Sequence, residues 1–165
     1  MRFSSAVTDK PGLDGLREIA RSCLDALGEG RLDLGILFFH PSYTPDIETL
    51  AAELEDAGLT SLVGSSGGGI VETSGEFETT PAASLIVGRL PGCYTEVFSI
   101  DGDEASPFPV LPKNSVQAAI VFADPFSANT QAYIEQLETA YPFVMTVGGL
   151  ASGTLLGGAR HSQEP

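Results

Sequence analysis

Two short glycine-rich segments have the composition that a ligand-binding loop needs. Residues 64–69 read GSSGGG, and residues 148–153 read GGLASG. Consecutive glycines accept positive φ angles and let the main chain approach a ligand closely. Their N–H groups can together form a nest that binds an anion such as a carboxylate. Close packing between strands also calls for glycine, so a ligand site and a purely structural connection are both open for each segment.

Each glycine segment is expected to follow a strand, and ligands of α/β sheets bind beyond the carboxyl ends of strands. We therefore predict that the two segments share one pocket. Asp124, between an apolar run and a predicted helix, either accepts a hydrogen bond from the amino group of a ligand or caps the helix. The predicted ligand-binding residues are Gly64, Ser65, Ser66, Gly67, Gly68, Asp124, Gly148, Gly149 and Ser152.

Residues 64–68 also match the nucleophile motif G-x-S-x-G, with Ser66 at its centre. Asp124 and His161 follow in the order of a Ser-Asp-His triad. That motif requires a helix directly after the serine, whereas residues 70–72 are β-like. His161 lies close to the end of the chain, where termini usually fray. We predict that the chain is not an enzyme, and a serine hydrolase acting through Ser66 is an alternative.

The other polar motifs predict no cofactor and no metal. Neither glycine segment carries the Lys-Ser/Thr pair of a P-loop. His40 ends an apolar run without a partner nearby in sequence, and is interpreted as a structural residue. Residues 101–104, DGDE, lack the remaining ligands of an EF-hand and indicate a solvated loop. Cys23 and Cys93 have no C-x-x-C neighbour, so neither zinc nor thioredoxin-like chemistry is expected.

Acidic residues dominate the charge of the chain: 22 acidic stand against 8 basic, a formal net charge of −14. This balance excludes nucleic acid and anionic membrane surfaces, because both bind clustered Lys and Arg. The acidity favours solubility, or it forms a docking face for a basic partner, so an acidic interaction scaffold without a ligand is a second alternative. Three observations predict a cytoplasmic protein. The two cysteines are lone thiols, residues 1–7 show no signal-peptide pattern, and no apolar run is long enough for a bilayer.

The apolar periodicity predicts the elements that position these residues. Helices are predicted at 13–27, from Thr44-Pro45 to Gly58, and from Ser127 or Asn129 to residue 140. Strands are predicted at 2–7, 32–39, 61–63, 70–72, 83–90, 94–100, 116–123 and 143–147. Residues 90–93 are expected to make a hairpin connection and 101–113 a surface loop. This order predicts a single domain over residues 1–165, a mixed-sheet α/β sandwich of βαβαβ, a strand run and a final βαβ.

Several of these segments, in their order along the chain, resemble the FIST domain family. The similarity lies in RFSSAV at 2–7, LGILFF at 34–39, LVGSS at 62–66, ADPFS at 123–127 and, most specifically, VGGLASG at 147–153. The resemblance is to the N-terminal FIST domain and covers nearly the whole chain. A cysteine often stands in the family where this chain has Ser65, so no thiol role carries over.

The resemblance implies a sensory module of intracellular signal-transduction proteins that binds a small ligand such as an amino acid. It also implies a companion C-terminal domain or an output domain, either on another chain or on a missing part of this one. The family domain is expected to continue beyond residue 165, so that the pocket is incomplete within this sequence.

Overall fold

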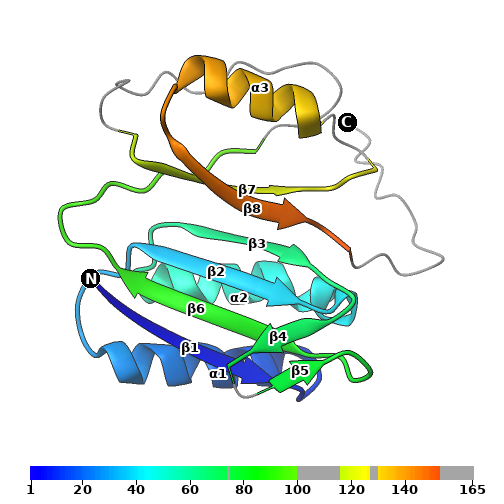
Figure 1. Ribbon diagram of the computed structural model, residues 1–165. Coiled ribbons are helices and arrows are strands. Elements are labelled where there is room, and N and C mark those ends of the chain that lie inside the picture. The colour runs from blue at the N-terminus through cyan, green and yellow to red at the C-terminus, as the bar shows by residue number, and fades with distance from the viewer. Residues whose placement is uncertain (74, 100–115, 127–129, 153–165) are drawn as a thin grey trace, which may run out of the picture. The chain divides into compact units, whose positions relative to one another are not determined.

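The computed structural model describes residues 1–73, 75–99, 116–126 and 130–152. These residues form two compact units. The first unit comprises Met1–Tyr94 together with Ser152, and the second comprises Thr95–Ala151 (Figure 1). Both units combine helix and strand, so the predicted α/β class is confirmed.

A four-stranded sheet with the order β1-β6-β2-β3 lies at the centre of the first unit. Its strands are β1 (Arg2–Thr8), β2 (Leu34–Phe39), β3 (Leu62–Ser66) and β6 (Ala83–Arg89). β6 runs antiparallel to both of its neighbours, whereas β2 and β3 are parallel. The sheet is therefore mixed, as predicted, and a helical crossover joins its two parallel strands.

Helices α1 (Gly12–Leu27) and α2 (Ile47–Asp56) pack on one face of this sheet (Figure 1). Their apolar stripes meet strand residues that point to the same side, which produces one core. That core includes Leu16, Ile19, Cys23, Leu50 and Leu54 from the helices and Leu37, Leu85 and Val87 from the strands. α1 ends as predicted, because Gly28 adopts a φ of 75° and its N–H donates to the carbonyl of Leu24.

A 3₁₀ helix, η1 (Pro41–Asp46), occupies the residues that were predicted to begin the second α-helix. The predicted start at Thr44-Pro45 is therefore wrong, and α2 begins at Ile47. His40 caps η1, because its Nδ1 accepts a hydrogen bond from the N–H of Ser42 at 3.2 Å. The sequence thus offers two cap signals, His40 followed by a proline and Thr44 followed by a proline, and the structure uses the upstream one.

The strand run after β3 is confirmed in part. It contains the hairpin of β4 (Ile70–Glu72) and β5 (Gly75–Phe77), of which only β4 was predicted. The turn at 90–93 forms, with the N–H of Cys93 donating to the carbonyl of Leu90 at 2.9 Å. The strand predicted to follow is wrong for residues 94–99, which form none. A strand paired with β6 across this turn would need an edge of β6, and β1 and β2 already occupy both edges.

The second unit contains the predicted final βαβ arrangement. Its elements are β7 (Ala118–Ala123), α3 (Thr130–Ala140) and β8 (Met145–Leu150). β7 and β8 pair in parallel, with Ala118 opposite Met145 and Ala123 opposite Leu150. Leu137 is the buried residue of α3. The predicted surface loop at 101–113, the helix caps Ser127 and Asn129, and His161 lie outside the described residues.

Candidate functional site

Both predicted glycine loops begin inside strands. β3 continues past residue 63 to Ser66, and β8 continues past residue 147 to Leu150. The strand ends predicted from the sequence are therefore too early. Glycine lowers strand propensity, but hydrogen-bonded pairing with a neighbouring strand outweighs that local preference. In the first segment the loop proper begins at Gly67.

One glycine in each parallel pair is required by the close approach of the neighbouring strand. Gly64 lies opposite Leu37 in the β2–β3 pair, and Gly148 lies opposite Val121 in the β7–β8 pair. A Cβ at either glycine would overlap the carbonyl oxygen of the opposite residue. Strand packing thus accounts for these two glycines without a ligand.

Three of the predicted site residues, Ser66, Gly68 and Ser152, lie together in the first unit. The N–H of Ser152 donates to the carbonyl of Ser66 at 3.3 Å. The N–H of Gly68 donates to Oγ of Ser152 at 3.4 Å, across 84 residues of sequence. The N–H of Gly67 donates to the carbonyl of Phe39 at 2.9 Å. Two amides that were predicted to hold an anion therefore already have acceptors within the protein.

Exposed main chain follows these two amides. Gly68 and Gly69 are exposed, and Ser65 and Ser66 beside them are half-buried. Ser65 points to the face of the sheet opposite the helices, because Gly64 next to it pairs with a residue of the core. The Ser65 hydroxyl donates to the carbonyl of Ser66 at 3.3 Å. The first unit thus offers a small polar surface beyond the carboxyl ends of β2 and β3.

The remaining predicted residues, Asp124, Gly148 and Gly149, belong to the second unit. Asp124 directly follows β7, and its Oδ1 accepts a hydrogen bond from the N–H of Phe126 at 2.9 Å. This contact is an Asx turn that redirects the chain after the strand. Gly149 lies opposite Phe122, and open space surrounds the position that its Cβ would take. Asp124 is exposed.

The surroundings of Ser66 differ from those of a hydrolase nucleophile. The next element after Ser66 is the strand that begins at Ile70, so the strand-to-helix elbow of that motif is not formed. The interpretation of His40 as a structural residue is confirmed. Its N–H donates to the carbonyl of Ala82 at 2.9 Å, and its Nδ1 holds the start of η1.

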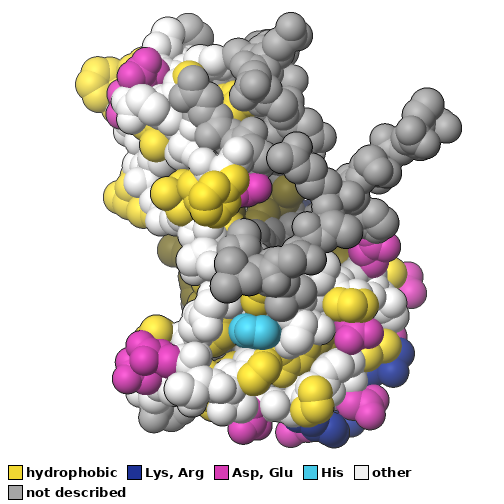
Figure 2. All heavy atoms as spheres, turned by 90° about the vertical axis from the view of Figure 1, so that its right-hand side faces the viewer, with side chains coloured by type: hydrophobic (Ala, Val, Ile, Leu, Met, Phe, Trp, Pro, Cys, Tyr) yellow, Lys and Arg dark blue, Asp and Glu magenta, His cyan; other side chains and the backbone are white. Residues whose placement is uncertain are grey.

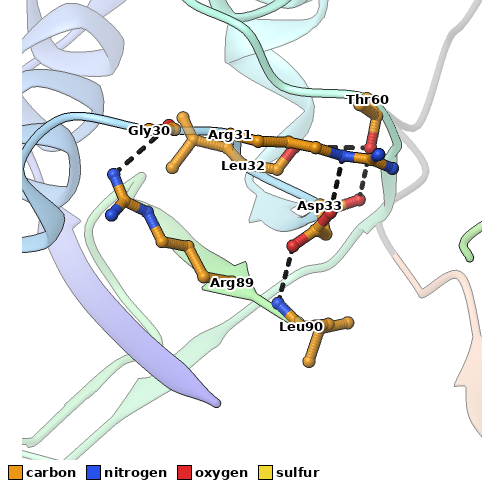
Figure 3. Close-up of polar contacts among 7 residues, drawn as sticks. All are labelled: Gly30, Arg31, Leu32, Asp33, Thr60, Arg89 and Leu90. Atoms are coloured by element: carbon orange, nitrogen blue, oxygen red, sulfur yellow. Dashed lines mark hydrogen bonds and ion pairs between the residues drawn. The ribbon is translucent and has the colours of Figure 1, made fainter. Parts of the chain in front are cut away.

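A polar cluster that sequence reasoning missed ties the start of β2 to the end of β6 (Figure 3). Asp33 is only 6% exposed; its Oδ1 pairs with Nε of Arg31 at 2.8 Å, and its Oδ2 accepts from the N–H of Leu90 at 2.7 Å. Arg89 donates to the carbonyls of Gly28 and Gly30. Figure 3 shows the two arginine guanidinium groups pointing in different directions, so they do not converge on one anion. The signal was an acidic residue inside an otherwise apolar strand-length run.

Figure 2 shows acidic side chains at separate places on one face, with hydrophobic and basic groups between them. Within the described residues no group of three His, Cys, Asp or Glu side chains is placed to hold a metal ion. A shallow depression of about 490 Å³ lies along α3 and is lined by residues outside the predicted site: Ala132, Glu135, Gln136, Thr139 and Ala140.

Comparison with known proteins identifies the family. The family model described as the FIST N domain matches residues 33–163, which is most of the chain. No curated protein and no solved structure matches the chain. None of the described helices combines the length and the hydropathy that a membrane span requires. The ordered segments, the mixed α/β fold and the extent of this match agree, and the chain belongs to the FIST N domain family.

Proposed function

We propose that this chain is the small-molecule-binding part of a cytoplasmic signal-transduction protein, and that its ligand resembles an amino acid. FIST domains are sensory, ligand-binding domains of signalling proteins, and membership in that family supports the proposal. A companion C-terminal domain or output domain, on another chain or on a further part of this one, would receive the signal. No chemical step on the ligand is part of this function.

The observation that carries the proposal is the junction of Ser66, Gly68 and Ser152. Two segments far apart in sequence meet there through two hydrogen bonds, and they leave glycine main chain exposed beside serine hydroxyls. The junction lies beyond the carboxyl ends of the parallel strands β2 and β3, where ligands of α/β sheets bind. Polar main chain and hydroxyl groups suit the carboxylate and ammonium groups of an amino acid.

Binding is tested with free amino acids added to the full chain. A ligand that binds only the folded state at about ten times its Kd stabilises that state by about 1.4 kcal/mol. For a chain of this size such a gain raises Tm by about 3–5 °C. In ¹⁵N-labelled protein, the amide shifts caused by the same ligand should concentrate at residues 65–69 and 152.

Gly68→Val is the variant that blocks the proposed site. The φ of Gly68 is not in the left-handed region, and the nearest atom to an added Cβ is the carbonyl oxygen of Ser152 at 3.9 Å. The fold therefore has room for a side chain at this position. We expect ligand affinity to fall at least about tenfold, with Tm of the free protein nearly unchanged. Ala52→Val, at an exposed position of α2 in the same unit, is the control and should bind as the wild type does. Amide shifts confined to α3 would refute this site, and no response to any amino acid would refute the ligand class.

A further inference from the structure

β1 is an edge strand whose outer side has no partner strand within the part of the chain that the structure describes. Its residues 3–8, FSSAVT, contain no charged residue and no proline. Natural edge strands are usually protected by such residues, because a bare edge pairs readily with another strand. In a chain with a net charge of −14, an uncharged edge of this length is a place where two copies can approach with little repulsion.

Small or apolar side chains lie on both sides of this edge, and Arg2 is the charged residue at its start. Phe3 is 56% exposed, and its ring lies over Gly88 on the face of the sheet away from the helices. On the other face, α1 presents Ser22 and Ala26, which are exposed and one helical turn apart. Ala26 lies close to the edge, because its carbonyl accepts a hydrogen bond from Arg2 at 3.2 Å.

The opposite edge of the same sheet is a poorer candidate. β3 has five residues, one of which is Gly64. The carbonyl of Ser66 at its end already accepts a hydrogen bond from Ser152. β1 is longer, and at seven residues it matches β6 along its whole length. β1 is therefore the longer edge of this sheet, and it is uncharged from Phe3 to Thr8.

We propose that β1 pairs antiparallel with β1 of a second copy, so that the sheets of the two copies join in a symmetric dimer. The sequence of β1 is self-complementary in the register centred on Ser5. Phe3 then lies opposite Val7 of the second copy on one face, and Ser4 lies opposite Ala6 on the helix face. Such a contact is isologous, which is the commonest symmetry of soluble dimers. It extends the hydrogen-bonded ladder that β1 and β6 begin.

The mass of the full chain in solution, measured by light scattering and sedimentation across a concentration series, tests the pairing. We expect a monomer–dimer equilibrium in the wild type. Hydrogen exchange at residues 3–7 should slow as the concentration rises. Wild-type protein that is monomeric at every concentration would overturn the proposal. So would a dimer in which residues 3–7 exchange at the monomer rate.

Ser5→Glu and Ser5→Lys test the register, because Ser5 is exposed and lies on the proposed two-fold axis. Each variant alone places like charges opposite each other, so we expect dimer affinity to fall at least about tenfold. An equimolar mixture of the two variants should restore association as a heterodimer. Ala52→Glu adds the same charge on α2 rather than on β1 and should dimerise as the wild type does. Unchanged dimerisation of both single variants would overturn self-pairing of β1.

Discussion

The parallel pairs β2–β3 and β7–β8 share one local design but differ in their surroundings. In each pair a glycine, Gly64 or Gly148, accepts the close approach of an opposite carbonyl group. β2 lies between β6 and β3 and contributes Leu37, 2% exposed, to the core. Every residue of β8 is exposed, including Val147 at 51%. Similar strands thus differ in burial because of the elements packed around them.

This contrast implies that the same substitution lowers the free energy of unfolding by different amounts in the two units. A strand held on both sides by the rest of a fold unfolds only with that fold, whereas an exposed pair can open locally. Matched substitutions in the two pairs test the contrast most directly.

The largest effect is expected for Gly64→Ala. The added Cβ overlaps the carbonyl oxygen of Leu37, which cannot move away because β2 is held between β6 and β3 and Leu37 is buried. We expect a loss of about 3–4 kcal/mol in the free energy of unfolding, measured by urea titration. Gly148→Ala creates the same overlap with Val121 and should cost about 1–2 kcal/mol, since β8 can open locally. Equal losses would show that the two pairs are equally constrained.

Val87→Ala and Val147→Ala remove the same atoms from a buried and from an exposed position, so any difference in stability loss reports burial. Val87 is fully buried in β6, so its truncation removes apolar contacts and leaves a cavity. We expect a loss of about 2–3 kcal/mol. Val147, half-exposed in β8, should change stability by less than about 0.5 kcal/mol. A large loss at Val147, in the same thermal or urea titration, would mean that β8 is buried in solution.

The smallest effect concerns an ion pair between the two helices of the first unit. Arg17 lowers the pKa of the Glu53 carboxyl group from its ordinary value of 4.5, chiefly through their hydrogen bond. A carboxyl group with a lowered pKa in the folded state adds stability at pH values above its unfolded pKa. That contribution is lost as the pH falls through the folded value. Glu53→Gln should therefore be less stable than wild type at pH 7, and the difference should shrink as the pH falls below 4.5.

Salt should weaken the difference at pH 7, because both side chains are about 40% exposed or more. Glu135→Gln on α3 is the matched control, because the partner of Glu135 is the uncharged Gln131, at 2.8 Å. Its stability relative to wild type should show no comparable loss between pH 7 and pH 3. If Glu53→Gln matched wild type at both pH values, the pair would contribute nothing in solution.

Sequence reasoning identified the elements with strong local signals. α1 was predicted from its apolar stripe and from Gly28, and a single residue with positive φ does end that helix. The family likeness was also readable, because it rests on ordered short motifs. The strand expected after Cys93 was wrong, since no edge of β6 is left for it. The sequence predicted that Ser66, Gly68 and Ser152 share a pocket. Only the tertiary structure shows the two hydrogen bonds that join them.

The amino-acid sequence by itself determined the helices and most strands, the net charge and the family, because propensity, periodicity and charge act locally along the chain. Only the tertiary structure decided which strands pair, which of two similar strand pairs is buried, and which glycine amides are already used in hydrogen bonds. Those outcomes depend on contacts between residues that are distant in sequence, such as Gly67 with Phe39 and Gly68 with Ser152. A local pattern carries no information about such partners.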